Sequence, residues 1–321
     1  MQCCKNSTTG AETAVSAYVA EAVRPLLSER RLGEVLMVNS KGIYLSVDDR
    51  ILFMCDASWG LVPLGIAIRD FSAVSASLGL SAGDRFVIGE NALCFPKKTL
   101  KICLEVRPRR AVSLSESPLP SRIREAATEI LRLKKTGGIS LLASPLVLGE
   151  PPEGVLCINP YCERAYGQLL LLLRALREDA DGVRSAVSAL LGLGTGLTPS
   201  ADDVLLGMLY AFRLLPNASP PYLFALRDAV LDGCGRGTNA VSAAYLRAIL
   251  DGAYFERIEE VWGGLCGQIP LDVARLTEIG SNSGSEMLLG MLLALLVCGY
   301  GNGEESRLLQ NDTIKERDDV L

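Results

Sequence analysis

The chain has 321 residues, which is enough for one large domain or two modest ones. Hydrophobic residues make up 49% and charged residues 21%, a balance that supports a sizeable core and excludes global disorder. A net charge of -5 argues against nucleic-acid binding, which needs a basic face. The chain contains no histidine, which excludes Ser-His-Asp catalysis, Cys-His catalysis and His-ligated zinc.

Eight of the ten cysteines are scattered without a CxxC pair, mostly within or beside apolar runs, and Cys3 and Cys4 are adjacent near the N-terminus. This placement predicts buried, reduced thiols rather than disulfides or a metal cluster, and therefore a reducing cytoplasm. The N-terminal residues lack the basic and apolar regions of a secretion signal. The longest apolar stretch, Met287 to Cys298, is too short to span a bilayer, so no membrane association is expected.

The first element expected is a helix over Ala11 to Ser28, within an N-terminal arm of residues 1–30. Residues 31–115 are rich in β-favouring residues divided by turn signals such as Asn39 to Gly42 and Val47 to Arg50. Strands are predicted over Val35 to Val38, Gly42 to Val47, Ile51 to Cys55, Leu64 to Ile68, Phe86 to Ile88, Ala92 to Phe95 and Leu100 to Val106. This spacing predicts a small antiparallel sheet or barrel.

A domain junction is expected near Arg107-Pro108 and Ser115 to Pro120. Arg107, Arg109 and Arg110 form a short basic cluster there, which is expected to be solvated surface. Residues 116–310 are expected to be mainly helical, before a polar tail of residues 311–321. Apolar periodicity predicts helices over Ile123 to Lys134, Cys162 to Arg177 and about 181–191, 200–214, 221–233, 239–251, 257–266 and 283–299. The fold class is therefore α+β.

Two segments of the helical region resemble each other. Ser200 to Leu209 aligns without gaps on Ser283 to Leu292. Each has a loop rich in Gly, Ser or Thr, an acidic first turn, and a helix that is apolar all round and must be buried. Gly207 and Gly290 occupy matching positions. Because glycine inside a helix costs about 1 kcal/mol relative to alanine, they indicate close approach of these helices to each other or to a third element. The alternative is chance similarity in a leucine-rich chain.

The loop before the first of these helices suits a small anion. Gly194 and Gly196 permit backbone angles that other residues avoid and let a ligand reach main-chain N–H groups. Thr198 is the expected N-cap, followed by Pro199 in the first turn. A helix N-terminus favours phosphate or carboxylate. The loop is not a Walker motif, because the Lys-Ser/Thr ending is missing.

Three acidic residues are the candidate catalytic groups. Of the adjacent Asp202 and Asp203, one can cap the helix while the other faces the pocket. A pocket-facing carboxylate could accept hydrogen bonds from a ligand amide, hold Mg²⁺ or act as a base. Glu286 takes the place of Asp203 in the second copy. No cofactor is expected beyond this option for Mg²⁺.

The remaining candidates contribute hydroxyl, amide or backbone N–H groups. Thr238, Asn239 and Ser242 begin another helix, where they serve either as its cap or as part of the pocket. The loop from Trp59 to Gly65 either walls the site or is ordinary packing. The candidate ligand-binding residues are Gly194, Thr195, Gly196, Thr198, Ser200, Thr238, Asn239, Ser242, Ser281, Asn282, Ser283 and Gly284.

These motifs resemble those of the AllH family. The run Gly194 to Asp203, extended by Gly192-Leu193, is similar to Gly-Leu-Gly-x-Gly-Leu-Thr-Pro-Ser-Gly-Asp-Asp. Thr238 to Leu246 resembles Thr-Thr-x-Ile-Ser-x-x-Tyr-Leu, and Ser283 to Gly290 resembles Ser-Gly-x-Asp-x-Leu-x-Gly. The resemblance covers roughly residues 30–300.

This chain departs from the family pattern at four places. Ala201, Asn239 and Glu286 stand where the family has Gly, Thr and Asp, and Ser281 lies near a position where many relatives carry His. These departures leave the acceptor substrate open.

The resemblance implies a subunit of oxamate carbamoyltransferase, which acts in anaerobic allantoin breakdown, a part of purine nitrogen catabolism. That enzyme transfers a carbamoyl group between oxalurate and phosphate, giving oxamate and carbamoyl phosphate. The implied partners are FdrA-like (AllF) and AllG-like subunits, and a carbamate kinase uses the product. Phosphate and carboxylate groups are expected on the backbone of Gly194 to Ser200, with Asp203 and Glu286 orienting the amide. The alternatives are a non-catalytic subunit that binds small anions or scaffolds the complex, and a purely structural helical repeat.

Overall fold

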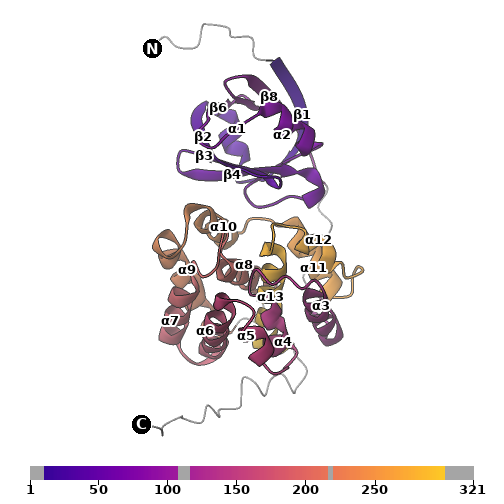
Figure 1. Ribbon diagram of the computed structural model, residues 1–321, viewed down its shortest axis with the longest axis vertical. Helices are drawn as coiled ribbons and strands as arrows, with labels where there is room; N and C mark the ends of the chain where they lie inside the picture. The colour runs from indigo at the N-terminus through magenta and orange to yellow at the C-terminus, as the bar shows by residue number, and fades with distance from the viewer. Residues whose placement is uncertain (1–10, 108–115, 216–219, 301–321) are drawn as a thin grey trace. The chain divides into compact units, whose positions relative to one another are not determined.

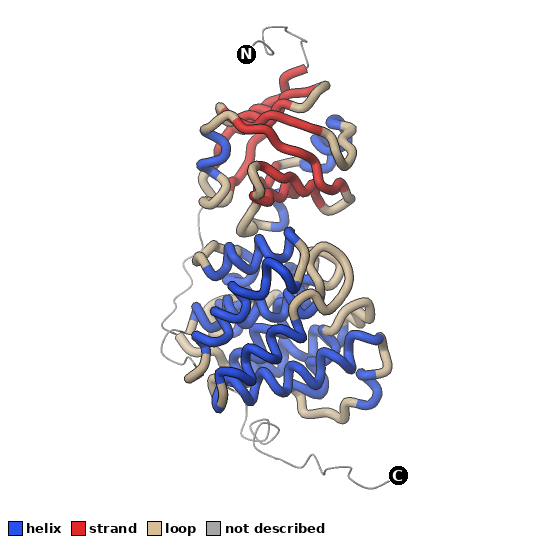
Figure 2. Tube along the Cα trace, turned by 90° about the vertical axis from the view of Figure 1, so that its left-hand side faces the viewer, coloured by secondary structure: helices blue, strands red, loops and turns tan. Residues whose placement is uncertain are grey.

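The computed structural model of the protein describes residues 11–107, 116–215 and 220–300. They form two compact units, one of residues 11–107 with Arg247–Glu259 and one of residues 116–215, 220–246 and 260–300. All strands of these described ranges lie in the first unit and the second is helical, so the predicted α+β class with an N-terminal barrel is confirmed (Figures 1 and 2). The predicted polar tail lies outside the described residues.

Eight strands close into a barrel in the order β1-β5-β4-β3-β2-β6-β7-β8 (Figure 1). Their bounds are β1 Ala11–Val19, β2 Arg31–Val38, β3 Gly42–Val47, β4 Arg50–Asp56, β5 Gly65–Ile68, β6 Arg85–Gly89, β7 Ala92–Cys94 and β8 Lys98–Glu105. Six neighbouring pairs are antiparallel, as predicted, but β4 pairs with β5 and β1 with β8 in parallel. The core of this unit lies inside the barrel.

Turn residues set two of the hairpins. Asn39 Oδ1 accepts hydrogen bonds from the N–H groups of Lys41 at 2.8 Å and Gly42 at 2.9 Å, which shapes the turn between β2 and β3. Asp48 and Asp49 both have positive φ, as a two-residue type I′ turn between β3 and β4 requires. Both turns fall where the sequence predicted them.

The helix predicted over Ala11 to Ser28 is wrong for most of its length. Residues Ala11–Val19 form β1, and only Arg24–Ser28 form a short helix, α1. Val15, Ala17 and Val19 are buried at the period of two that a strand imposes. The alanines favour a helix locally, but pairing with β5 on one edge and β8 on the other outweighs that preference.

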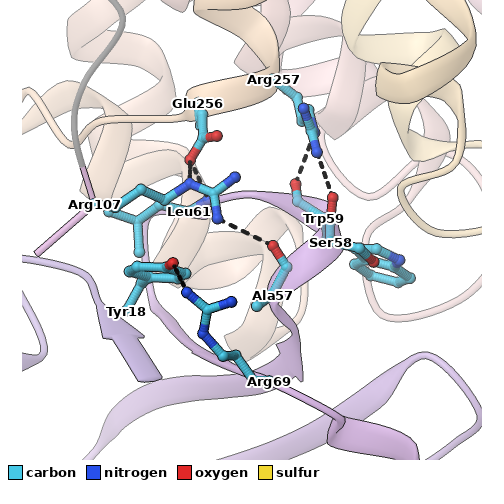
Figure 3. A network of polar contacts seen from close by, with 9 residues as sticks. All are labelled: Tyr18, Ala57, Ser58, Trp59, Leu61, Arg69, Arg107, Glu256 and Arg257. Carbon is cyan, nitrogen blue, oxygen red and sulfur yellow. Dashed lines mark hydrogen bonds and ion pairs between the residues drawn. The ribbon is translucent and has the colours of Figure 1, made fainter. Parts of the chain in front are cut away.

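Arg107, which follows β8, is not the solvated side chain that the sequence predicted. Its side chain is 25% exposed, and its Nε atom pairs with a Glu256 carboxylate oxygen at 2.6 Å (Figure 3). The guanidinium also stacks on the Tyr18 ring, 4.8 Å from its centroid, and donates to the Ala57 carbonyl at 3.2 Å. Arg109 and Arg110 lie outside the described residues.

The loop after β4 is held by the same carboxylate. It begins with a 3₁₀ turn, η1 Ala57–Trp59, and Glu256 accepts the Leu61 N–H group at 2.9 Å (Figure 3). Arg257 donates to the carbonyls of Ser58 and Trp59. These contacts explain the Trp59 to Gly65 loop as packing within the first unit. A further helix of this unit, α2 Phe71–Leu78, was not predicted.

Removing the Glu256 carboxylate is expected to destabilise the first unit. Glu256→Ala leaves the Leu61 N–H group and the Arg107 guanidinium without their buried acceptor, at a cost of about 3 kcal/mol in the free energy of unfolding. Urea unfolding followed by Trp59 fluorescence, with Trp262 replaced by Phe, measures this unit. Glu12→Ala is the control, because its ion pair with Lys101 is exposed and 3.9 Å long and is worth less than about 1 kcal/mol. Equal losses of unfolding free energy in Glu256→Ala and Glu12→Ala would contradict the role of Glu256 in stabilising this unit.

The second unit is built from helices. In chain order they are α3 Pro120–Arg132, η2 Ser140–Leu142, α4 Ala143–Val147, α5 Glu153–Leu156, α6 Pro160–Glu178, α7 Ala180–Leu190, α8 Ser200–Leu214, α9 Leu223–Gly237, α10 Ala240–Leu250, α11 Glu256–Leu265, α12 Val273–Thr277 and α13 Ser283–Val297, with residues 247–259 grouped in the first unit. Every predicted helix of this region is present. The short elements η2, α4, α5 and α12 were not predicted, because they are too short to show a helical period.

Helices α8 and α13 form the centre of the helical unit (Figure 1). Every residue of α8 except Arg213 is buried, and every residue of α13 except Ser283. A Cβ on Gly207 would lie 2.0 Å from the Met287 carbonyl oxygen, and one on Gly290 would lie 2.0 Å from the Val204 carbonyl oxygen. The predicted close approach is therefore confirmed, and it occurs between these two helices.

The cysteines of the described ranges are all free, but they are not all buried as predicted. Cys55, Cys162, Cys234 and Cys266 are buried, whereas Cys94, Cys103 and Cys157 are exposed and Cys298 is intermediate. No helix among the described residues combines the length and apolar character that crossing a membrane requires.

Candidate functional site

The glycine loop joins α7 to α8 and contains three glycines in the left-handed region. Gly192, Gly194 and Gly196 have φ angles of 77°, 134° and 88°. A Cβ on Gly194 would lie 2.3 Å from the Ser200 nitrogen, so this glycine also allows the loop to fold back on the start of α8. Thr195 and Gly196 are exposed, which leaves the tip of the loop open to a ligand.

The start of α8 differs from the prediction. The helix begins at Ser200 with Pro199 as its N-cap, and no side chain caps it, so the cap predicted at Thr198 is wrong. Thr198 Oγ1 instead lies 3.0 Å from Ser283 Oγ at the start of α13. This hydroxyl pair brings the two repeated motifs together.

The backbone of the loop retains hydrogen-bonding capacity. The N–H groups of Ala201, Asp202 and Asp203 are satisfied by carbonyls of Leu193 and Pro199. Within the described part of the chain, the N–H groups of residues 195–198 donate to no backbone carbonyl. Donors at a helix N-terminus favour an anionic ligand, so the loop is the part of the site suited to phosphate or carboxylate.

Asp202 ties three segments together rather than capping α8. Its Oδ1 atom accepts the Gly192 N–H group at 2.8 Å, and its Oδ2 atom accepts the Ser242 hydroxyl at 2.6 Å and the Thr238 hydroxyl. Burial raises its pKa, and these three donors act in the opposite direction. With both oxygens engaged, Asp202 holds the glycine loop to the start of α10.

Thr238, Asn239 and Ser242 are largely accounted for by these structural roles. Asn239 Oδ1 accepts the N–H groups of Val241 at 3.0 Å and Ser242 at 3.1 Å, which is the geometry of an N-cap for α10. Thr238 and Ser242 bind Asp202. The start of α10 accounts for the Asn239 contacts, and the anchoring of Asp202 accounts for those of Thr238 and Ser242. A ligand contact for these three residues stays a prediction.

At the start of α13, Ser283 lies at the candidate site, whereas Gly284 lies where α12 packs against α13. Asn282 is the N-cap residue, although its side chain makes no capping bond, and Ser281 is exposed. A Cβ on Gly284 would lie 1.8 Å from the Leu276 carbonyl oxygen, so this glycine allows α12 to pack against α13. A direct ligand contact for Gly284 stays a prediction.

Asp203 is a buried carboxyl with one unpartnered oxygen. It is 2% exposed, and no hydrogen-bond partner for its Oδ2 atom lies within the described ranges. Burial holds its pKa well above the ordinary value, and the nearby Glu286 raises it further. Hydrogen bonds from the Ser283 and Thr198 hydroxyls act in the opposite direction.

Glu286 is buried beside it on α13. It is 1% exposed, and its Oε1 atom accepts the Ile139 N–H group at 3.0 Å. Burial raises its pKa, while hydrogen bonds from Ser200 and Ile139 and the positive charge of Lys135 lower it. Asp203 and Glu286 are therefore two buried carboxyls that act on each other.

The contacts between α8 and α13 are reciprocal. A Cβ on Gly207 would meet the Met287 carbonyl oxygen, and one on Gly290 would meet the Val204 carbonyl oxygen, which are equivalent positions of the two copies. Ser283 of the second copy acts on the Asp203 carboxyl of the first, and Ser200 of the first acts on the Glu286 carboxyl of the second. The aligned positions of the sequence repeat therefore face each other across the helix pair.

Sequence analysis missed the segment that follows α3. A Cβ on Gly138 would lie 1.8 Å from Glu286 Oε1, so only glycine lets this loop deliver the Ile139 N–H group to the carboxylate. Asn159 Nδ2 donates to the Gly138 carbonyl at 2.7 Å and holds the loop in place. The signal in the sequence is the Gly137-Gly138 pair, which follows the helix predicted over Ile123 to Lys134.

The described ranges also contain a pocket in the first unit and show no candidate metal centre. The pocket has a volume of about 360 Å³ and is lined by Tyr18, Val19, Glu21, Arg24, Leu61, Glu105, Val106, Arg107, Tyr254 and Glu256. None of these residues belongs to the candidate site. In the part of the chain that the structure describes, no three Cys, Asp or Glu side chains cluster as a metal site would require.

A family model matches part of the chain. No solved structure matches the chain. The matching family is described as "Oxamate carbamoyltransferase subunit AllH", a description that names one subunit of a transferase complex. Its model matches residues 190–295, the segment that contains α8, α13 as far as Leu295 and every candidate site residue. This match confirms the resemblance to the family within these residues, and the resemblance predicted for the rest of residues 30–300 stays a prediction.

Proposed function

We propose that this chain is the subunit of an oxamate carbamoyltransferase that holds the small anions of the reaction, in which oxalurate and phosphate give oxamate and carbamoyl phosphate. The observation that carries the proposal is the 3.0 Å contact between the Thr198 and Ser283 hydroxyls. It places the exposed glycine loop next to the start of α13, so that two helix N-termini serve one site. Their positive ends favour anions with several oxygen acceptors.

Different residues of the site have different chemical roles. The N–H groups of residues 195–198 and the Thr198 hydroxyl bind phosphate or carboxylate oxygens. The Asp203 and Glu286 pair orients the amide of the ligand, and the Thr198 and Ser283 hydroxyls connect the pair to the ligand. Because the chain has no histidine, positioning and electrostatic stabilisation supply most of the rate enhancement that this subunit contributes.

The proposal includes partners and a place of action. FdrA-like and AllG-like subunits complete the enzyme in the cytoplasm, where a carbamate kinase uses carbamoyl phosphate to make ATP. No cofactor is assigned to this chain, and assays with and without Mg²⁺ test that assignment.

The test is oxalurate phosphorolysis by the complex co-expressed with its partner subunits. Gly196→Val forces a β-branched residue into a φ of 88° and moves the loop N–H groups, so kcat/KM is expected to fall on the order of 100-fold. Asp203→Asn is expected to lower activity as well. Gly154→Ala on α5 is the control, since its Cβ meets nothing within 4 Å.

Unchanged activity in both site variants would exclude this site from the reaction. If, in addition, no phosphate density appears near Thr198 after soaking, the chain would be a scaffolding subunit of the same complex.

A further inference from the structure

Three oxygen-bearing side chains meet where α8 packs against α13. The Thr198 and Ser283 hydroxyls lie 3.0 Å apart, and both act on the neighbouring Asp203 carboxyl, whose pKa they lower. Each hydroxyl can donate one hydrogen bond and accept another, so the pair can take up a proton on one side and release one on the other.

Burial of Asp203 and Glu286 also favours a proton on one of the two carboxyls. Asp203 and Glu286 are both buried, and Asp203 Oδ2 has no partner within residues 11–107, 116–215 and 220–300. A buried carboxylate is stable only when its oxygens are hydrogen-bonded or paired with a positive charge. Two neighbouring carboxyls that both lack water are therefore most stable with one of them neutral.

The charged neighbours do not remove this preference. Lys135 acts on Glu286, whereas Asp202 adds a second negative charge next to Asp203. Cys162 of α6 also lies close to Glu286, and burial raises the pKa of its thiol, so it stays neutral.

We propose that Asp203 and Glu286 hold one proton between them and that the Thr198 and Ser283 hydroxyls pass it to and from a ligand on the loop of residues 194–198. The two hydroxyl residues are half-buried, whereas Thr195, Gly196 and Ser281 are exposed. The hydroxyls therefore lie between the buried pair and solvent. The relay step rests on the proposed function, but the shared proton does not.

The proposed reaction needs such a group. A phosphate oxygen forms a bond to the carbamoyl carbon, and the bond from that carbon to the oxamate nitrogen breaks. The nitrogen must gain one proton as it leaves, and monohydrogen phosphate loses one as it attacks, so the reaction has no net proton change. A carboxyl pair with one proton can donate the first and accept the second.

Difference infrared spectroscopy of the purified full-length chain tests the shared proton directly. At neutral pH we expect the C=O stretch of one protonated carboxyl, which is lost in Asp203→Asn or Glu286→Gln. The control is Asp232→Asn, which removes an exposed carboxyl and should leave the band unchanged. The wild-type spectrum alone is decisive, because absence of the band at neutral pH overturns the proposal even if a variant fails to fold.

Kinetics of the complete complex tests the relay. Thr198→Val and Ser283→Ala are both expected to lower kcat on the order of 100-fold. Ser283→Ala keeps the Thr198 hydroxyl that contacts phosphate, so its KM for phosphate should change little. Thr198→Ser keeps a hydroxyl at this position and should recover most of the kcat that Thr198→Val loses. Wild-type kcat in both deletion variants would overturn the relay. A wild-type complex that cannot act on oxalurate would contradict the proposed function and the relay together, and the infrared result would still decide the shared proton.

Discussion

Gly207→Ala is expected to lower the free energy of unfolding of the helical unit by about 3 kcal/mol or more. The added methyl group would lie 2.0 Å from the Met287 carbonyl oxygen, and this obstacle is backbone that cannot rotate away. The axes of α8 and α13 must separate, which loosens the packing of two fully buried helices. Gly290→Ala should behave alike, because its Cβ would lie 2.0 Å from the Val204 carbonyl oxygen.

Urea unfolding monitored by Trp262 fluorescence, in a Trp59→Phe background, measures this effect. Gly167→Ala is the matched control: it lies in the interior of α6, and its Cβ meets nothing within 4 Å. That substitution should stabilise the unit by about 1 kcal/mol. The double variant at 207 and 290 should cost less than the sum of the single variants, since both separate the same two helices. A neutral Gly207→Ala would disprove the close approach.

Asp202→Ala is expected to destabilise the same unit by about 4 kcal/mol. The substitution removes the acceptor of three donors, which are the Gly192 N–H group and the Thr238 and Ser242 hydroxyls. The hydroxyls can turn to other acceptors, but the N–H group cannot. The glycine loop and the start of α10 should loosen together, which limited proteolysis of the folded protein would detect.

Asp202→Asn separates the contribution of charge from that of shape. Its amide oxygen still accepts the Gly192 N–H group, so we expect about half the loss measured for alanine. Thr238→Val removes one donor and should cost about 1 kcal/mol. If Asp202→Ala proved as stable as the wild-type protein, Asp202 would not be the residue that anchors the loop.

Local chemistry predicted the hairpins of the barrel but not its closure. Asn39 and the Asp48-Asp49 pair act within a few residues of themselves, so their turns could be located from the sequence. Strand β1 could not, because its alanines favour a helix and its partners β5 and β8 lie far away in the chain. The alternation of Val15, Ala17 and Val19 indicates a strand, but the helical preference of the alanines conceals it in the sequence.

The repeat predicted the central helix pair for a physical reason. A glycine that costs stability within a helix persists where a side chain cannot fit, and Gly207 and Gly290 both meet a carbonyl of the opposite helix. The same pattern aligned Asp203 with Glu286, but it could not show that Asp202 anchors the loop. The donors to Asp202 come from Gly192, Thr238 and Ser242, which only folding brings together.

The sequence by itself determined the α+β class, the central helix pair, the exposed glycine loop and the family to which residues 190–295 are matched. These follow from periodicity, turn chemistry and motif spacing, which are properties of neighbouring residues. The tertiary structure alone decided that Asp202 is an anchor, that Asp203 and Glu286 form one buried pair, and that Gly138 and Ile139 complete it. Burial and hydrogen-bond partners set these roles, and both come from segments that only folding brings together.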